Sequence, residues 1–281
     1  MNKKTLLLKK YLKDNNCYNV PTCHDPLSAK LIEQKKFNIS FIGGFALSSA
    51  SLGYPDASLI TQKELVDYTR NICNHTKLPV IVDADTGFGS LSNVYKTVKD
   101  LENAGASALV LEDQVFPKRC ALTDNVELLD INNAKDRVAI AVEAKKENNN
   151  ILLFARTDAL TSGNLDEAIK RANQFKKCGA DLIFITGINT KKQIQEISAQ
   201  VKNIPLMLNI TPKIKFKINE VKKNKFKFAL FSQQILNAYI DSANSTLDLI
   251  KKNKIPKSKN KSSDTLNLLD FKKFLRIEKS R

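Results

Sequence analysis

Eight short apolar runs recur along this chain, and this series is the feature that most constrains its fold. The runs are rich in Val, Ile, Leu and Phe and are near-continuous, which is typical of parallel strands buried on both faces. They are YNVPTC (18–23), NISFIGGF (38–45), PVIVDAD (79–85), ALVLEDQ (108–114), ILLFART (151–157), LIFITGI (182–188), PLMLNIT (205–211) and KFALFS (227–232). Most are followed by a helical pattern, so the sequence predicts an α/β fold, a (β/α)₈ TIM barrel that uses nearly all of its 281 residues.

Helix boundary signals support this division. Asp25 is a candidate N-cap, Thr61 and Glu64 have the spacing of a capping box, and Gly105 and Gly179 follow helical patterns as C-caps. A doubly wound sheet is the alternative, but no GxGxxG motif follows the first predicted strand.

The C-terminal part has a different composition. Residues 251–264 are polar and basic and include Pro256, whereas TLNLLDFKKFLRIEK beyond them has an apolar helical stripe. We expect a barrel catalytic domain over residues 1–250, a basic linker over 251–264 and a C-terminal helix over 265–281. That helix can dock on its own barrel or on a neighbouring subunit, and the sequence leaves both open.

The charge balance constrains the partners. The net charge is +16, but the basic residues are scattered from Lys3 to Lys279 and no nucleic-acid-binding motif is present. We interpret the excess as a solvated surface whose diffuse field favours anionic substrates, and we expect no nucleic-acid partner. The apolar run near the N-terminus is too short for a signal peptide, no run approaches a membrane span, and the five cysteines form no CxxC pair. These features predict a cytoplasmic protein with free thiols and no membrane partner.

Acidic residues gather where the predicted strands end. Asp83 and Asp85 lie two residues apart and share one face of a strand, Glu112 ends the next run, and Asp56 follows the second run. Strand C-termini meet at one rim of a barrel, where four carboxylates would repel one another unless a cation held them. A lone pair of aspartates would more often cap a helix or pair with lysine. The four together predict Mg²⁺, with Mn²⁺ as the alternative ion.

Basic residues accompany these acids. Arg156 is the only basic residue in its apolar run, so we expect a buried anionic partner for it, either a substrate carboxylate or phosphate or a rim acid. Lys118 and Arg119 follow Glu112 and are candidates to clamp an anionic substrate.

Several stretches together resemble the isocitrate lyase/phosphoenolpyruvate mutase superfamily. They are VPTCHDPLSAKL, GGFALSSASLGYPD, VDADTGFG, AGASALVLEDQVFPKRC, ARTDAL, GADLIF and NIT, spread over residues 18–211. Within the superfamily the chain is most similar to short bacterial-type members that resemble methylisocitrate lyase, dimethylmalate lyase, oxaloacetate hydrolase and carboxyphosphonoenolpyruvate mutase.

The resemblance implies a site and a chemistry. It implies a barrel that forms a homotetramer with swapped last helices, and Mg²⁺ that stabilises an enolate-like oxyanion while a C–C or P–C bond breaks. It implies Mg²⁺ held by Asp83 and Asp85, directly or through water, with Asp56 and Glu112 in the outer shell. The implied catalytic residues are Cys120, Lys118 and Arg156, and the implied substrate-binding residues are Gly43, Gly44, Phe45, Arg119, Asn209 and Thr186.

The chain departs from the family pattern in the loop after Glu112. Lys118, Arg119 and Cys120 match the lyase branch, but Ala121 and Leu122 stand where Gly and His are expected. Asp124, Asn125 and Val126 replace a further Gly-Lys pair. We therefore expect Cys120 to be a weaker acid–base group than in that branch.

Two further departures touch the pocket. Gly43 replaces a common serine, and Thr186 replaces a common glutamate. Together with the loop, they indicate an altered substrate or weak activity.

Three functions compete on this basis. The leading one is a Mg²⁺-dependent C–C lyase for a small 2-hydroxy- or 2-oxo-di- or tricarboxylate such as methylisocitrate or oxaloacetate. The second is P–C bond chemistry on a phosphonate, by a mutase or a phosphonopyruvate hydrolase. The third is a catalytically impaired barrel that binds a metabolite.

Overall fold

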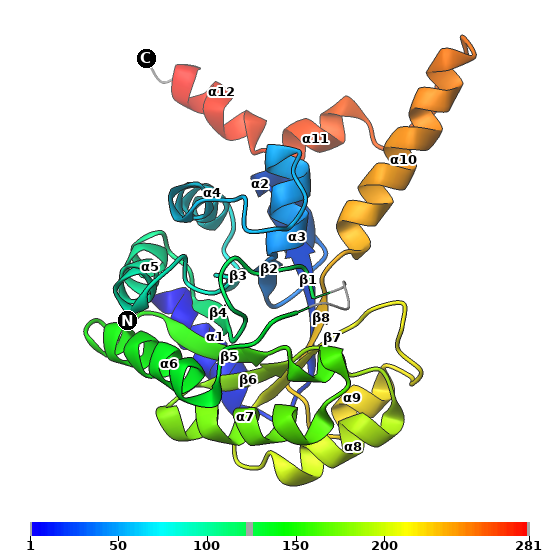
Figure 1. The fold of residues 1–281 in the computed structure, drawn as a ribbon. Helices are drawn as coiled ribbons and strands as arrows, with labels where there is room; N and C mark the ends of the chain where they lie inside the picture. The colour runs from blue at the N-terminus through cyan, green and yellow to red at the C-terminus, as the bar shows by residue number, and fades with distance from the viewer. Residues whose placement is uncertain (1, 122–125, 280–281) are drawn as a thin grey trace.

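Eight parallel strands close into a barrel in chain order in this computed structural model, which describes residues 2–121 and 126–279 (Figure 1). The strands are β1 (Tyr18–Cys23), β2 (Ser40–Ile42), β3 (Val80–Asp83), β4 (Ala108–Glu112), β5 (Leu152–Thr157), β6 (Leu182–Ile185), β7 (Leu206–Asn209) and β8 (Phe228–Phe231). Each lies within one of the eight apolar runs, so the predicted (β/α)₈ barrel is confirmed.

Helices follow the strands, and most of them pack around the outside of the barrel. They are α1 (Lys3–Lys13), α2 (Pro26–Gln34), α3 (Gly44–Leu47), α4 (Gln62–Asn74), α5 (Leu91–Asn103), α6 (Ile131–Lys146), α7 (Leu165–Cys178), α8 (Lys191–Gln200), α9 (Asn219–Lys223) and α10 (Gln234–Lys251), with a π-helix η1 (Ser48–Leu52) and a 3₁₀-helix η2 (Ala159–Ser162). The predicted N-cap Asp25, the capping box of Thr61 and Glu64, and the C-cap Gly179 are all present.

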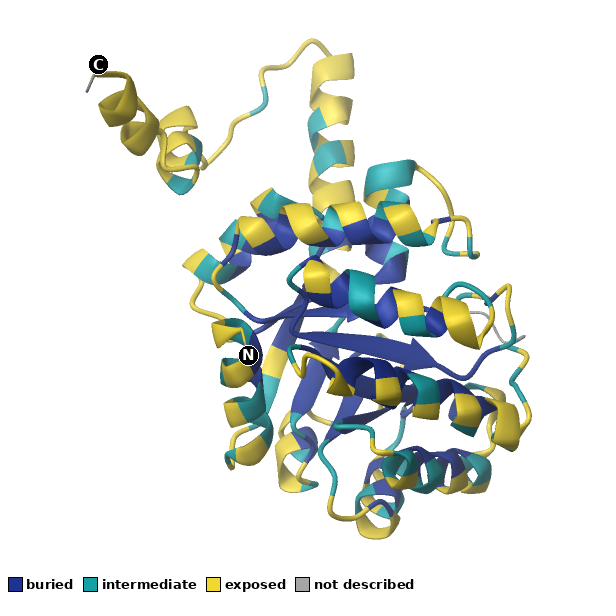
Figure 2. Cartoon of the chain, turned by 90° about the vertical axis from the view of Figure 1, so that its left-hand side faces the viewer, coloured by how far each residue is buried: buried dark blue, intermediate teal, exposed yellow. Residues whose placement is uncertain are grey.

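Two apolar layers hold the barrel together (Figure 2). One fills the inside of the barrel, where Phe41, Phe154 and Phe228 are almost fully buried, and the other packs the helices on the outside of the sheet. Helix α1 contributes Leu8, which is fully buried, to the inner layer. The strands are therefore apolar on both faces, which explains why their sequences do not alternate.

The register of the strands places the rim residues beside one another. Glu112 on β4 pairs with Arg156 on β5, and Asp83 on β3 pairs with Val110 on β4. The last residues of these strands therefore present their side chains at the same end of the barrel.

The C-terminal segment differs from the prediction. The single helix predicted over residues 265–281 is instead two helices, α11 (Ser262–Leu268) and α12 (Phe271–Lys279). The break falls at Asp270, whose φ of 55° lies in the left-handed region and cannot continue a right-handed helix.

Helix α10 extends away from the barrel, and the C-terminal segment then returns so that α11 contacts α2 (Figure 1). Most residues of the segment are exposed (Figure 2), and among the described residues a salt bridge joins its Asp270 to Lys30 on α2 at 3.9 Å. None of the described helices is long and apolar enough to cross a membrane.

Candidate functional site

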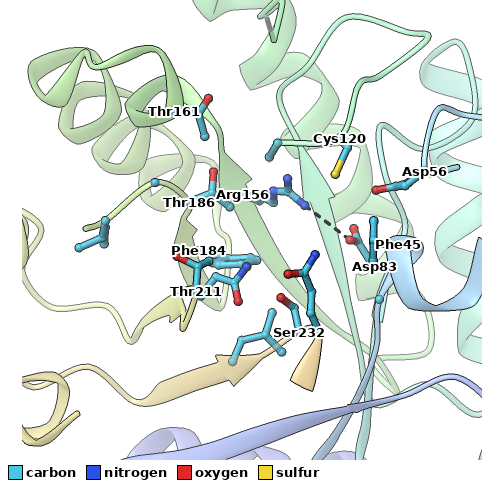
Figure 3. Close-up of a pocket in the computed structure, with 18 of the residues that line it drawn as sticks. Phe45, Asp56, Asp83, Cys120, Arg156, Thr161, Phe184, Thr186, Thr211 and Ser232 are labelled. Atoms are coloured by element: carbon cyan, nitrogen blue, oxygen red, sulfur yellow. Dashed lines mark hydrogen bonds and ion pairs between the residues drawn. The ribbon is translucent and has the colours of Figure 1, made fainter. Parts of the chain in front are cut away.

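A pocket opens at the rim where the strands end, and most of the predicted site residues line it (Figure 3). The predicted residues on its wall are Gly43, Gly44, Phe45, Asp56, Asp83, Cys120, Arg156, Thr186 and Asn209. The structure thus brings together residues that are far apart in the sequence. Asp85, Glu112 and Lys118 are buried beside this wall, and Arg119 is exposed on the following loop.

Arg156 is the centre of one buried ion-pair network. Its guanidinium binds Asp158 in a bidentate manner, with Nε 2.8 Å from Oδ1 and NH2 2.9 Å from Oδ2. Its NH1 atom lies 3.0 Å from Glu112 Oε2 and 3.5 Å from Asp83 Oδ2. Burial would lower the pKa of Arg156, but these three carboxylates raise it well above its ordinary value. The expected anionic partner of Arg156 is therefore an internal one.

Lys118 is the centre of a second network. Its ammonium lies 2.5 Å from Asp56 Oδ1 and 3.0 Å from Asp85 Oδ1, and the residue is only 3% exposed. Burial opposes the charged form, but the surrounding acids raise the pKa of Lys118 well above its ordinary value. Lys118 is therefore a buried counterion of the rim acids in this structure.

We call Asp56, Asp83, Asp85 and Glu112 the acid cluster. Burial raises the pKa of Asp85 to about 6, with Lys118 opposing this shift and Asp83 and Asp56 adding to it. Burial likewise raises the pKa of Glu112 well above its ordinary value, although Arg156 opposes it. Burial is the main cause of both shifts, and the neighbouring cations Lys118 and Arg156 offset it only in part.

The acid cluster fits a divalent cation in its donors and its charge. All of its ligating atoms are carboxylate oxygens, which Mg²⁺ and Mn²⁺ prefer, and Glu112 Oε1 is buried with no hydrogen-bond partner among the described residues. Across residues 2–121 and 126–279, however, no three His, Cys, Asp or Glu side chains are gathered closely enough to hold an ion as they stand. Lys118 and Arg156 already contact the acids, so an ion that binds here competes with Lys118 for Asp56 and Asp85.

Gly44 leaves room for these groups, which gives a first prediction. A Cβ atom at Gly44 would lie 3.2 Å from Asp85 Oδ1, 3.3 Å from Asp56 Oδ1 and 3.5 Å from Lys118 Nζ. We expect Gly44→Ala to displace these carboxylates and to weaken Mn²⁺ binding about tenfold, as overpacking of a tight site does. Titration followed by electron paramagnetic resonance would measure this.

The neighbouring glycine is the matched control. The atoms nearest to a Cβ atom at Gly43 would belong to Thr22 and Phe41, at 3.4 Å or more. Gly43→Ala should therefore leave Mn²⁺ affinity within about twofold of wild type. Equal affinities of the Gly44→Ala variant and wild type would contradict the placement of the ion.

Gln114 connects the loop after β4 to the Arg156 network. Its Nε2 donates to Asp158, and its Oε1 accepts from the backbone N–H of Arg119 at 2.9 Å. Thr186 also donates to Asp158, through its hydroxyl. Although burial raises the pKa of Asp158, Arg156 and these hydrogen bonds hold it below its ordinary value. The loop that carries Cys120 is thus tied to the buried carboxylate that orients Arg156.

Two residues of this network were missed by the sequence reasoning. Asp158 follows Arg156 at the same two-residue spacing that drew attention to Asp83 and Asp85, and that spacing was the available signal. Gln114 carried no such signal, because an amide after a strand is common in loops. Of the changed positions in the Cys120 loop, Ala121 lines the pocket, whereas Leu122, Asp124 and Asn125 lie outside the described residues.

Known proteins are similar to this chain over most of its length. The family model described as phosphoenolpyruvate phosphomutase matches residues 8–251. An oxaloacetate decarboxylase from Bradyrhizobium sp. (strain ORS 278) is 32% identical, over 96% of this chain and 94% of its own. A 2-methylisocitrate lyase from Aeropyrum pernix is 32% identical, over 86% of this chain and 78% of its own.

A solved structure is similar to this chain in both fold and sequence. A phosphonopyruvate hydrolase in complex with oxalate and Mg²⁺ superposes with a TM-score of 0.89 and 27% identity, over 99% of this chain and 98% of its own.

Proposed function

The chain belongs to the phosphoenolpyruvate mutase family, within the isocitrate lyase/phosphoenolpyruvate mutase superfamily, and we propose that it is a Mg²⁺-dependent carbon–carbon lyase. Its proposed substrate is a small 2-hydroxy- or 2-oxo-di- or tricarboxylate. The observation that carries this proposal is the acid cluster, which meets Arg156 at the floor of one pocket. The relatives named as a decarboxylase and a lyase of small carboxylates support it.

The proposed metal ligands are Asp83 and Asp85, directly or through water, with Asp56 and Glu112 outside them. Mn²⁺ is the alternative ion, and the Mg²⁺ of the phosphonopyruvate hydrolase structure supports the choice of metal. When bound, the ion supplies positive charge where negative charge develops on the substrate as the bond breaks.

The chain's own residues bind and orient the substrate in this proposal. Arg156 NH1 contacts Glu112 and Asp83 in this structure, so a substrate carboxylate that it holds competes with these two acids, while Asp158 fixes the plane of the guanidinium. Gly43 and Gly44 give close access to the backbone, and Phe45 adds apolar surface to the pocket wall. Thr186 and Asn209 add a hydroxyl and an amide to the opposite wall.

A panel of substrates tests this proposal. Purified protein with Mg²⁺ would be followed by ¹H and ³¹P NMR with methylisocitrate, dimethylmalate, oxaloacetate and phosphonopyruvate, and EDTA would serve as the control. Turnover of a carboxylate that EDTA abolishes would support the lyase. Turnover of phosphonopyruvate alone would instead show that the protein breaks a P–C bond. This chemistry is the second candidate, and the altered loop and the similarity to the phosphonopyruvate hydrolase favour it. No turnover with metal still bound would favour a barrel that only binds a metabolite.

Cys120 is the proposed acid–base residue, and it lies on the pocket wall. Because its usual Gly-His neighbours are absent from the sequence, we expect Cys120→Ser to lower kcat by less than about 100-fold, the low end for loss of a positioned acid or base. Steady-state kinetics on the panel substrate that turns over would measure this. Cys178→Ser, at the end of α7, is the control and should not change kcat. Complete loss of activity in the Cys120→Ser variant would contradict this expectation, because it would show that Cys120 is a full-strength acid.

We also propose that the chain is a homo-oligomer, with a tetramer as the expected form, and that the last helices dock on a neighbouring subunit. The support is that Phe271, Phe274 and Leu275 on α12 are all exposed, since apolar faces of this kind mark interaction surfaces. The five cysteines are free thiols, which supports a cytoplasmic location.

A charge placed on α12 tests the oligomer. Phe274→Asp should lower the molar mass measured by light scattering, because it puts a carboxylate into an apolar interface. Lys272→Asp on the same helix is the control and should retain the mass of wild type. An unchanged mass in the Phe274→Asp variant would contradict docking through this face.

A further inference from the structure

One buried amide lies between the Arg156 network and the loop that carries Cys120. It belongs to Gln114, which is only 1% exposed. Its Nε2 donates to Asp158 Oδ2, and its Oε1 accepts from the backbone N–H of Arg119 at 2.9 Å. A reversed amide would turn its oxygen toward a carboxylate and its donors toward an N–H, so the two contacts permit a single orientation. Gln114 thus holds a carboxylate and a backbone donor at a fixed separation.

One end of this amide acts on Arg156 through Asp158. Arg156 NH2 lies 2.9 Å from Asp158 Oδ2, the same oxygen that accepts from Gln114. Arg156 Nε lies 2.8 Å from the other oxygen, Oδ1, so the plane of the guanidinium follows the plane of the carboxylate. Loss of the amide would remove one of the contacts that fix this carboxylate. The orientation of Arg156 therefore depends on Gln114.

The other end of the amide acts on Cys120 through the backbone. The N–H of Arg119 and the carbonyl of Lys118 belong to one peptide group, and that carbonyl accepts from the hydroxyl of Ser58 at 3.2 Å. The peptide group is therefore held at both its donor and its acceptor. Cys120 comes next after Arg119 in the chain, and it lines the same pocket as Arg156 (Figure 3).

The backbone of Gln114 is itself held in place. Its carbonyl accepts at 2.7 Å from NH1 of Arg137, a residue of α6 that is 6% exposed. Gln114 also forms an isolated antiparallel bridge with Leu128, and the N–H of Val115 donates to the carbonyl of Glu127 at 2.8 Å. The two ends of the loop are thus joined where Gln114 lies. A side chain on an anchored backbone can hold its neighbours within the small tolerance that a catalytic site needs.

We propose that Gln114 is a positioning residue, which sets where Cys120 lies relative to the guanidinium of Arg156. The inference rests on the proposed function, in which Arg156 holds the substrate and Cys120 transfers a proton. These two groups must keep their spacing, because a misplacement of about 1 Å in a catalytic site can cost on the order of 10² in rate. Gln114 acts through Asp158 on one side and through the peptide group before Cys120 on the other.

The rate at which iodoacetamide alkylates Cys120 tests this role without metal, substrate or turnover. Mass spectrometry of the Cys120 peptide separates this rate from those of the other thiols. Gln114→Met keeps the length of the side chain but removes both hydrogen bonds, so we expect the rate to rise about fivefold as the loop gains freedom. Gln62→Met is the matched control and should leave the rate within about twofold of wild type. The Gln62 amide also donates to a carboxylate, that of Asp100 at 2.8 Å, and neither residue lines the pocket.

A second substitution tests the connection between the two ends of the amide. Asp158→Asn alters the carboxylate that Gln114 and Arg156 share. It should change the Cys120 alkylation rate about threefold or more in otherwise wild-type protein, but less than about twofold in the Gln114→Met background. If the Asp158→Asn protein does not fold, Thr186→Val takes its place, because it removes another donor to Asp158.

Two results would overturn the proposal. One is an unchanged Cys120 alkylation rate in the Gln114→Met variant, and the other is an equal effect of the second substitution in both backgrounds. A residue that only stabilises the fold would give that second result, because its effect would add to that of Asp158→Asn. Since the alkylation assay needs no turnover, a failure of the lyase proposal would appear only in the substrate panel.

Discussion

Arg156→Met is expected to destabilise the fold by about 3–5 kcal/mol and to abolish turnover, because breaking a buried ion pair leaves its partners uncompensated. Asp158 and Glu112 both lose their nearest cation in this variant, and each is at most 1% exposed. Urea unfolding would give the free energy of unfolding. A loss of less than about 1 kcal/mol would contradict the account of this network.

Two companion variants identify the cause of that loss. Arg156→Lys keeps the positive charge but cannot bind Asp158 through two nitrogens, so it should retain more stability than Arg156→Met while turnover stays low. Adding Asp158→Asn to Arg156→Met removes one uncompensated carboxylate and should recover part of the lost stability. Additive losses in the double variant would mean that the two residues do not act as a pair.

Asp85→Asn is expected to lower turnover by a factor on the order of 10²–10³ with a change in unfolding free energy within about 1 kcal/mol. Stability is spared because burial already disfavours the charged form of Asp85, and Lys118 keeps its contact with Asp56. Kinetics on the substrate that turns over, together with urea unfolding in EDTA, would measure both quantities.

Asp113→Asn is the matched control, because Asp113 follows Glu112 directly but faces away from the acid cluster. Its carboxylate accepts from Arg171 at 3.0 Å and from the backbone N–H of Asp158 at 3.1 Å. We expect the Asp113→Asn substitution to lower the free energy of unfolding by about 1–3 kcal/mol. If Asp85→Asn instead lost stability and kept turnover, the acid cluster would be structural.

The barrel was predictable because its signal is local and repeated. Each strand is a short unbroken apolar run, and each run lies at its predicted place, since burial on both faces imposes the same pattern eight times. The break at Asp270 was not predictable, because the apolar stripe continues across it and the left-handed backbone of one residue leaves no pattern.

The residues that form the site were predictable from the sequence, but the ion pairs among them were not. Asp83, Asp85 and Glu112 are at strand ends, so their place at the rim follows from the fold. Lys118 and Lys213 lie in loops whose paths depend on tertiary contacts. For that reason the sequence did not reveal that Lys118 is buried between Asp56 and Asp85, or that Lys213 reaches the pocket.

The central claim is that the acid cluster binds a catalytic divalent cation even though Lys118 and Arg156 contact it. The most direct measurement is a Mn²⁺ titration of the full chain followed by electron paramagnetic resonance, repeated with Asp83→Asn and Asp85→Asn. We predict that wild type binds a single Mn²⁺ that Mg²⁺ displaces, and that both variants lose this binding. Failure of wild type to bind Mn²⁺, or undiminished binding by both variants, would contradict the claim.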